Sequence, residues 1–285
     1  MNLILSRKGF DASYGGMPSP IMPDGRLMPL PIPSSHDHNT FGDLYEDSQE
    51  IGCLLKDLSG GKYTINSRIH LDPWLRNVDQ QKGWRPSLGQ TGAAQGHLSK
   101  NGIKPGDIFL FFGWFREVEK VAGRWRYRKD APNQHIIFGW LEIEQVYSIN
   151  GERDKCLRQF PWLQMQPHFA SPNYYDSHLN TIYIGANKSH YNNGSKSGGG
   201  YFTCFKKDLC LTKSGETRTI WNLPKWFMPS EKKPHLTYHP MGNRWIREGD
   251  KVKLKSASKG QEFILNGSCY PELADWIKEI ISQKD

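Results

Sequence analysis

The segment GDIFLFFGWFREVE at residues 106–119 carries the strongest β-strand signal in the chain. A second segment, HIIFGWLEIEQV at residues 135–146, repeats its Phe-Gly-Trp core and its change from a continuous apolar run to an apolar–acidic alternation. This pattern is typical of a strand that begins in a buried core and ends at the surface. The two segments predict paired antiparallel strands within residues 106–148, at the centre of a sheet or a barrel.

The flanking sequence predicts peripheral elements around this centre. A strand opens the chain, and a further strand is expected over 63–69. Helical spacing indicates a helix over 48–58 with Ser48 as its N-cap and a closing amphipathic helix over 271–283. Thr91 as a cap and Gly102 after the end indicate a short helix over 91–101. An Asp-Gly turn at 24–25 and the segments 250–256 and 262–267 predict two hairpins.

Together these elements predict a single α+β domain over residues 1–285. It is built either on a mostly antiparallel sheet or on a partly closed barrel with peripheral helices.

Composition narrows the possible partners and compartment. The net charge of +8 and the pI of about 9.1 favour an anionic partner, most commonly nucleic acid or a nucleotide. The five cysteines are odd in number and contain no C-x-x-C pair, which argues against a disulfide framework and a Cys-rich zinc ribbon. The sequence shows neither a signal-peptide pattern nor an apolar run long enough to cross a membrane, so we expect a cytoplasmic protein.

The segment SRKGFDASYGG at residues 6–16 follows the first strand directly. This segment can present cations and backbone N–H groups to a phosphate. The cations are Arg7 and Lys8, and the glycine pair is Gly15 and Gly16. Asp11 is a candidate acceptor or base. The segment matches no named phosphate-binding loop, and an exposed turn is the alternative.

The segment RIHLDP at residues 68–73 holds a candidate metal site. His70 and Asp72 are two residues apart on the expected strand, so their side chains share a face. A His-x-Asp pair is two-thirds of the facial triad that binds non-haem Fe(II), and a second histidine would complete it. The candidates for that histidine are His97, His135, His168 and His178. The alternative is a strand end at which Asp72 caps a turn before Pro73.

Two further groups of residues are candidates for base recognition. In LGQTGAAQGHL, residues 88–98, Gln90 and Gln95 can read the edge of a base, and His97 lies beside them on the short helix. The alternative for His97 is a half-buried polar group. The loop SSHDHN, residues 34–39, lacks partners at zinc spacing and is interpreted as a surface loop.

The segment RWRYRK at residues 124–129 alternates cations with rings. Arg124, Arg126 and Arg128 would lie on one strand face, suited to phosphate contact with base stacking on the rings. The alternative is a basic hairpin in contact with solvent.

Five segments carry a resemblance to a known family: SRKGFDASYGGMPSPIMPDG, IHLDP, GQTGAAQGHL, GDIFLFFGWFR and HIIFGWLEIE. Together they resemble the third of the nucleotide modification associated domain families, bacterial and phage proteins linked to DNA-base hypermodification. The resemblance implies a link to modified nucleotides. It makes eight residues the preferred site positions: Arg7, Lys8, Asp11, His70, Asp72, Gln90, Gln95 and His97. Residues 103–148 also resemble the PUA-like barrels, which include readers of modified bases.

Three functional hypotheses follow. The first is an enzyme of a DNA-base hypermodification or modified-DNA defence pathway, with its reaction class (transferase, hydrolase or oxygenase) open. In it, Asp11 or His70 moves a proton, phosphate binds at residues 7–8, and residues 90–97 read the base. The second keeps this substrate but makes His70 and Asp72 ligands of Fe(II) in an oxygenase. The third is a non-catalytic PUA-like reader of modified DNA.

Overall fold

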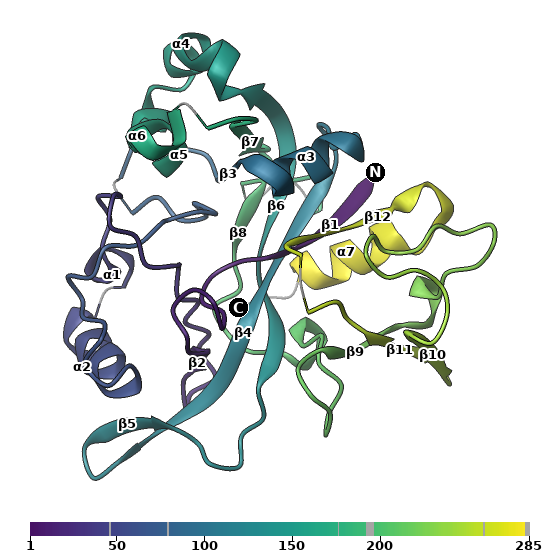
Figure 1. Ribbon diagram of the computed structural model, residues 1–285, viewed down its shortest axis with the longest axis horizontal. Coiled ribbons are helices and arrows are strands. Elements are labelled where there is room, and N and C mark those ends of the chain that lie inside the picture. The colour runs from purple at the N-terminus through teal and green to yellow at the C-terminus, as the bar shows by residue number, and fades with distance from the viewer. Residues whose placement is uncertain (46, 79, 176, 192–196, 259, 283–285) are drawn as a thin grey trace.

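Two long antiparallel strands form the centre of the fold: β4 (Ile108–Val121) and β6 (Gln134–Ser148). The apolar half of each strand is buried and the alternating half emerges toward solvent, as their sequences predict. β5 (Arg124–Tyr127) pairs with the outer end of β4. The prediction for residues 106–148 is therefore confirmed, and Figure 1 shows the two strands running through the middle of the molecule.

The protein is described here from a computed structural model that covers residues 1–45, 47–78, 80–175, 177–191, 197–258 and 260–282. Its main sheet has nine strands and follows the order β12-β1-β4-β6-β7-β3, with β2 and β5 on β4 and β8 on β6. The remaining strands of this sheet are β1 (Asn2–Arg7), β2 (Ser19–Ile21), β3 (Ser87–Gln90), β7 (Thr181–Gly185), β8 (Gly199–Tyr201) and β12 (Glu262–Asn266).

Most neighbours in this sheet are antiparallel, whereas β1 and β2 run parallel to β4. Over the described residues β12 and β3 are not paired with each other, so the sheet does not close into a barrel. Of the two architectures expected from the sequence, the mostly antiparallel α+β sheet is the one present.

A second sheet and the helices surround this core (Figure 1). The second sheet has the order β10-β11-β9, from β9 (Ile220–Pro224), β10 (Trp245–Glu248) and β11 (Lys251–Lys255). The α-helices are α1 (Phe41–Leu44), α2 (Ser48–Leu58), α3 (Gly92–Lys100), α4 (Ile149–Gln159), α5 (Pro167–Ala170), α6 (Pro172–Tyr175) and α7 (Leu273–Ser282). Short 3₁₀ turns are η1 (Pro161–Met165), η2 (Lys207–Leu209), η3 (Lys225–Phe227) and η4 (Gly267–Cys269). Within the described part of the chain, no helix is long and apolar enough to span a membrane.

Three local predictions were wrong. Residues 63–69 form no strand, because their backbone groups make only isolated bridges, such as the one from Ile69 to Pro33. The late hairpin does not form either. The continuously apolar β12 is buried beside β1, whereas the alternating β11 pairs with β9 and β10. Helix α2 is capped by Asp47, which accepts a hydrogen bond of 2.8 Å from the Glu50 N–H, rather than by Ser48.

Phe112 of β4 joins the two sheets. Its ring lies 5.2 Å from the rings of both His135 on β6 and Trp221 on β9, and 6.1 Å from the ring of Phe263 on β12. All of these distances are those of favourable aromatic pairs. Phe112 is fully buried, so removing its ring would leave a cavity where the main sheet meets the second sheet.

We expect Phe112→Ala to lower the free energy of unfolding by about 3–5 kcal/mol, the usual cost of a buried aromatic truncation. Urea unfolding followed by circular dichroism measures this as a lower midpoint with an unchanged slope. Val121→Ala, at the exposed end of the same strand, is the control and should stay within about 0.5 kcal/mol of the wild type. Equal stability of the two variants would contradict the assigned role of Phe112.

Candidate metal centre and its cavity

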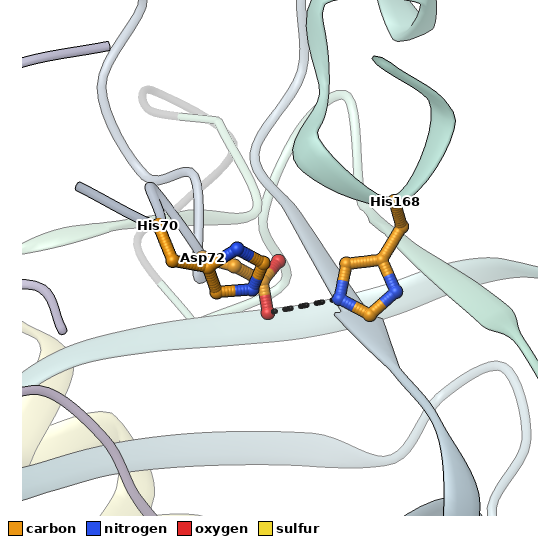
Figure 2. A group of neighbouring side chains, drawn as sticks. All are labelled: His70, Asp72 and His168. Carbon is orange, nitrogen blue, oxygen red and sulfur yellow. Dashed lines mark ion pairs between the residues drawn. The ribbon is translucent and has the colours of Figure 1, made fainter. Parts of the chain in front are cut away.

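His70, Asp72 and His168 converge from two distant parts of the chain (Figure 2). One ligand atom from each lies within 4.8 Å of the other two. The first two residues follow Ile69 in the loop before Pro73, and His168 comes from α5. Both imidazoles are buried, and the Asp72 side chain is only 4% exposed. Of the four histidines that the sequence offers as a third ligand, the fold selects His168.

A buried carboxylate orients the His70 imidazole. His70 Nδ1 lies 3.0 Å from Asp37 Oδ2. Burial by itself would raise the pKa of Asp37, but the hydrogen bond with His70 and the charge of that ring outweigh it, so this pKa lies below its usual value. An ionised Asp37 accepts a hydrogen bond from Nδ1–H, and this leaves His70 Nε2 available to a metal.

A buried amide orients the His168 imidazole. The Asn180 amide nitrogen donates to the backbone carbonyls of His168 (3.3 Å) and Tyr174 (2.8 Å), which identifies its Oδ1 as the acceptor. This oxygen lies 2.8 Å from His168 Nδ1, so Nδ1 carries the proton. Burial, with a smaller effect from the charge of His70, lowers the pKa of His168 to about 3. His168 is therefore neutral near pH 7, with an unprotonated Nε2.

Asp72 is fixed through one carboxylate oxygen. Its Oδ1 accepts hydrogen bonds from the Gly89 N–H (2.7 Å) and from the Gln166 side chain (2.9 Å). Its Oδ2 lies 3.9 Å from His168 Nε2, the contact drawn dashed in Figure 2. Burial raises the pKa of Asp72 to about 6, against the opposing charges of His70 and Lys8. A metal cation beside this buried carboxylate would offset its desolvation.

The donor set fits a divalent metal. Two imidazoles and one carboxylate form the facial triad of non-haem Fe(II) sites, and three-ligand zinc sites use similar donors. Both histidines are held by hydrogen bonds through Nδ1, as is usual for metal-binding histidines. An ion about 2.0–2.2 Å from each ligand would draw the three side chains slightly together.

The cluster lies on the wall of a cavity of about 660 Å³. The cavity is open where β1 and β3 end, which brings Lys8 and Gln90 to it. Glu262 Oε1 connects these two side chains, since it accepts from Lys8 Nζ at 3.2 Å and from Gln90 Nε2 at 2.7 Å. Glu262 is itself buried. This polar wall therefore faces the metal ligands across one shared space.

The structure brings six of the predicted site residues to this cavity: Arg7, Lys8, Asp11, His70, Asp72 and Gln90. Two of them also have local structural contacts. Arg7 donates to the carbonyls of Ala257 and Ser258, each at 2.9 Å. Asp11 Oδ1 accepts from the N–H groups of residues 13 and 14, each at 2.7 Å, and so stabilises the turn that follows.

The other predicted residues lie outside the cavity. Gln95 is buried and forms hydrogen bonds with Ser99 and Tyr183. The His97 ring packs at a tilt against Tyr238, and its Nε2 lies 3.2 Å from Thr237 Oγ1.

Gly15 and Gly16 have positive φ angles of 86° and 76°, and neither lines the cavity. Gly15 packs so closely on the Phe10 ring that a Cβ there would overlap it.

Arg124 and Arg126 of β5, and Arg128 just after it, lie beside the outer end of β4, with which β5 pairs. Arg126 pairs with Glu119, and Arg128 pairs with both Glu117 and Asp130. Their charges are partly offset by these acids, and they do not line the cavity.

Several residues of the site carry no motif that singles them out. Gln166, Tyr174 and Asn180 come from the segment around α5 and α6, for which the sequence makes no site prediction. Asp37 carries no such motif either. In SSHDHN both histidines are exposed, as expected of a surface loop, while the residue between them is buried.

A family model described as nucleotide modification associated domain 3 matches residues 2–266, nearly the whole chain. No curated protein and no solved structure matches the chain.

We expect Gly89→Ala to impair the candidate metal centre without changing a ligand. A Cβ at residue 89 would overlap the His168 ring and lie 2.6 Å from its Nε2. The ring must then move, and Zn²⁺ affinity measured by equilibrium dialysis should fall at least about tenfold. Gly96→Ala in α3 is the matched control, because its Cβ meets only Leu179 at an ordinary 3.5 Å. Equal affinity in both variants would contradict the assigned position of His168.

Proposed function

Because the chain belongs to the nucleotide modification associated domain 3 family, we propose that it is an enzyme that modifies a nucleotide or a DNA base with a metal ion held by His70, Asp72 and His168. The observation that carries this proposal is that the fold already orients the three side chains for metal binding. Each histidine uses Nδ1 in a hydrogen bond, and His168 directs an unprotonated Nε2 toward the Asp72 carboxylate. Buried His239 also holds its Nδ1 in a hydrogen bond, but its Nε2 accepts from the Ala257 N–H, so its ring is used up by the fold.

The ligand number favours a catalytic role over a structural one. Structural zinc sites are usually closed by four protein ligands, whereas three ligands leave positions open for substrate. The cluster also faces a cavity rather than the packed core. Bound Fe(II) would supply oxygen chemistry at such a site, and bound Zn²⁺ would supply an activated water. We favour Fe(II), because the ligand set is the facial triad.

Tyr174 covers the ligands from the cavity side. Its ring stacks on His168 at 4.5 Å and its hydroxyl lies 3.5 Å from His70 Nδ1. Burial, followed by the charges of Asp37 and Asp72, raises its pKa to about 12. The phenol therefore stays protonated near pH 7. It shields the two imidazoles from solvent and presents a neutral hydrogen-bond donor.

Lys8 and Gln90 are suited to orient the substrate. Lys8 Nζ has three N–H donors, one of which is directed to Glu262. Its charge is near enough to the cluster to oppose the raised pKa of Asp72. A nucleotide with an anionic group or a carbonyl edge toward Lys8 would therefore present its base or sugar to the metal ligands.

We expect anaerobically prepared protein, reconstituted with Fe(II), to hold about one ion per chain. Asp72→Ala and His168→Ala should retain less than a tenth of it by elemental analysis. The same variants should abolish any mass change in nucleotides or DNA incubated with the protein. His178→Ala is the control, because this histidine is exposed on the same segment of chain. Its metal content should equal that of the wild type.

The opposite results separate the alternatives. If wild-type protein binds neither Fe(II) nor Zn²⁺, the metal enzyme is excluded and the non-catalytic reader becomes the better hypothesis. If it binds Zn²⁺ selectively and activity follows zinc, the oxygenase is excluded while the metal site remains.

We further expect Asp37→Asn to lower metal affinity by about 10–100-fold, the usual effect of changing a group that orients a ligand. The amide can still accept from His70 Nδ1, but it lacks the negative charge that makes the ring a better ligand. His36→Gln, at the exposed neighbouring residue, should leave the affinity unchanged. Competition with a chromogenic chelator measures both. An unaltered affinity in Asp37→Asn would show that this carboxylate does not support the site.

A further inference from the structure

A second, smaller cavity of about 70 Å³ lies next to the first. The two cavities share Arg7, Asp11 and Ser258 in their walls. We propose that the small cavity binds the terminal phosphate of a mononucleotide, so that the base or sugar of the same molecule extends into the large cavity toward His70, Asp72 and His168. The phosphate site stands on its own geometry, and only the direction of the base rests on the function proposed above.

His135 supplies a neutral donor to the small cavity. Its Nδ1 accepts a hydrogen bond of 3.0 Å from the Trp221 indole N–H, so the ring proton is on Nε2. His135 is only 4% exposed, and burial keeps its pKa well below the usual value, so the ring stays neutral. No acceptor for Nε2–H is found in the part of the chain that the structure describes. Because His135 lines the cavity, this donor is available to a ligand there.

Arg218 supplies a charged group without a counterion contact. Its guanidinium lies 4.1 Å from the centroid of the Trp114 ring, a cation–π contact that holds its plane. Over the described residues, its side chain forms no hydrogen bond or ion pair with a carboxylate or a carbonyl. A stacked guanidinium keeps its N–H edge available, which is the geometry with which arginine binds phosphate.

Arg7 completes the set of polar groups that line the small cavity. Two of its nitrogens are occupied by backbone carbonyls, but its Nε is buried without a hydrogen-bond partner. Burial, and to a smaller extent the charge of Arg218, lowers the pKa of Arg7, while Asp11 opposes this. Two like charges line one cavity here, and an anion bound in it would relieve their repulsion.

The local charge balance leaves room for this anion. The small cavity has two guanidinium groups and a single carboxylate, that of Asp11, so one positive charge is not compensated. One oxygen of Asp11 is already engaged by the N–H groups of Ser13 and Tyr14. Asp11 therefore stabilises the turn and offsets one of the two positive charges, and the second charge remains for an anion.

The size of the cavity favours a terminal phosphate. A water molecule needs about 10–15 Å³ of such volume, so this cavity holds one small oxyanion and its contacts. The rings of Phe10 and Trp114 form part of its wall. A phosphodiester within a polymer continues on both sides of the phosphorus, whereas the phosphate of a mononucleotide continues on one side only, here toward the large cavity.

The test is isothermal titration of the full-length, metal-free protein with the four 2′-deoxynucleoside 5′-monophosphates, the corresponding nucleosides and inorganic phosphate. At least one monophosphate should bind about tenfold or more tightly than its nucleoside. Arg218→Gln should remove that advantage, a loss of about 10–100-fold for hydrogen bonds to a charged group, and should leave nucleoside affinity unchanged. The monophosphate affinity of Arg218→Lys should lie between those of the wild type and Arg218→Gln. Lysine keeps the positive charge but lacks the paired N–H donors of the guanidinium group.

Arg247→Gln is the matched control, because it removes the same charge from an exposed residue of β10. It should bind every probe as the wild type does. Thermal unfolding of each variant verifies that the fold is retained.

Three results would overturn the inference. The first is equal affinity of the wild type and Arg218→Gln for every probe, including the case in which no phosphate compound binds. The second is equal affinity for nucleoside and monophosphate. The third is an oligonucleotide without a terminal phosphate that binds as tightly as its 5′-phosphorylated form. None of these results changes the metal content, so failure of the phosphate site is distinguishable from failure of the metal centre.

Discussion

The candidate site depends on the burial of a single carboxylate, that of Asp72. A buried anion must be compensated by hydrogen bonds or by cations. Here the compensation comes from the Gly89 amide at the end of β3 and from the Gln166 side chain beside α5. The same two contacts connect three segments that are distant in sequence, and they bring His168 within 3.9 Å of the free carboxylate oxygen. The hydrogen bonds that compensate the Asp72 charge thus also hold the three cluster residues close together.

β1 connects this cluster to the rest of the fold. The strand lies between β12 and β4, so its apolar residues are covered on both sides and its end is fixed. At that end, Lys8 faces the large cavity, and Arg7 lies in the walls of both cavities. One strand end therefore fixes Arg7 and Lys8, and with them part of the wall of each cavity.

The parts of the fold that sequence predicted are those with a local cause. The apolar runs of β4 and β6 indicate directly which part of each strand is buried, and the apolar spacing of α2 indicates a helix. Thr91 and Gly102 mark the ends of α3 in the same local way. Strand partners are not local, which is why β12 was assigned to β11 rather than to β1. In the site, the His-x-Asp pair was recognisable at short range. The choice of His168 among four histidines depended on the path of the chain between β3 and β7.

The candidate metal cluster depends on Gly89 as well as on its three ligand residues, because Gly89 leaves space for the His168 ring. The His168 ring fills the space that a side chain at residue 89 would occupy. Glycine at 89 and histidine at 168 therefore depend on each other. Among relatives, substitution at either position should be accompanied by change at the other. A lineage that has lost the metal chemistry would be recognised by a larger residue at 89 even where His70 and Asp72 persist. The residue at position 89 therefore indicates whether the His168 ring can occupy its place in the cluster.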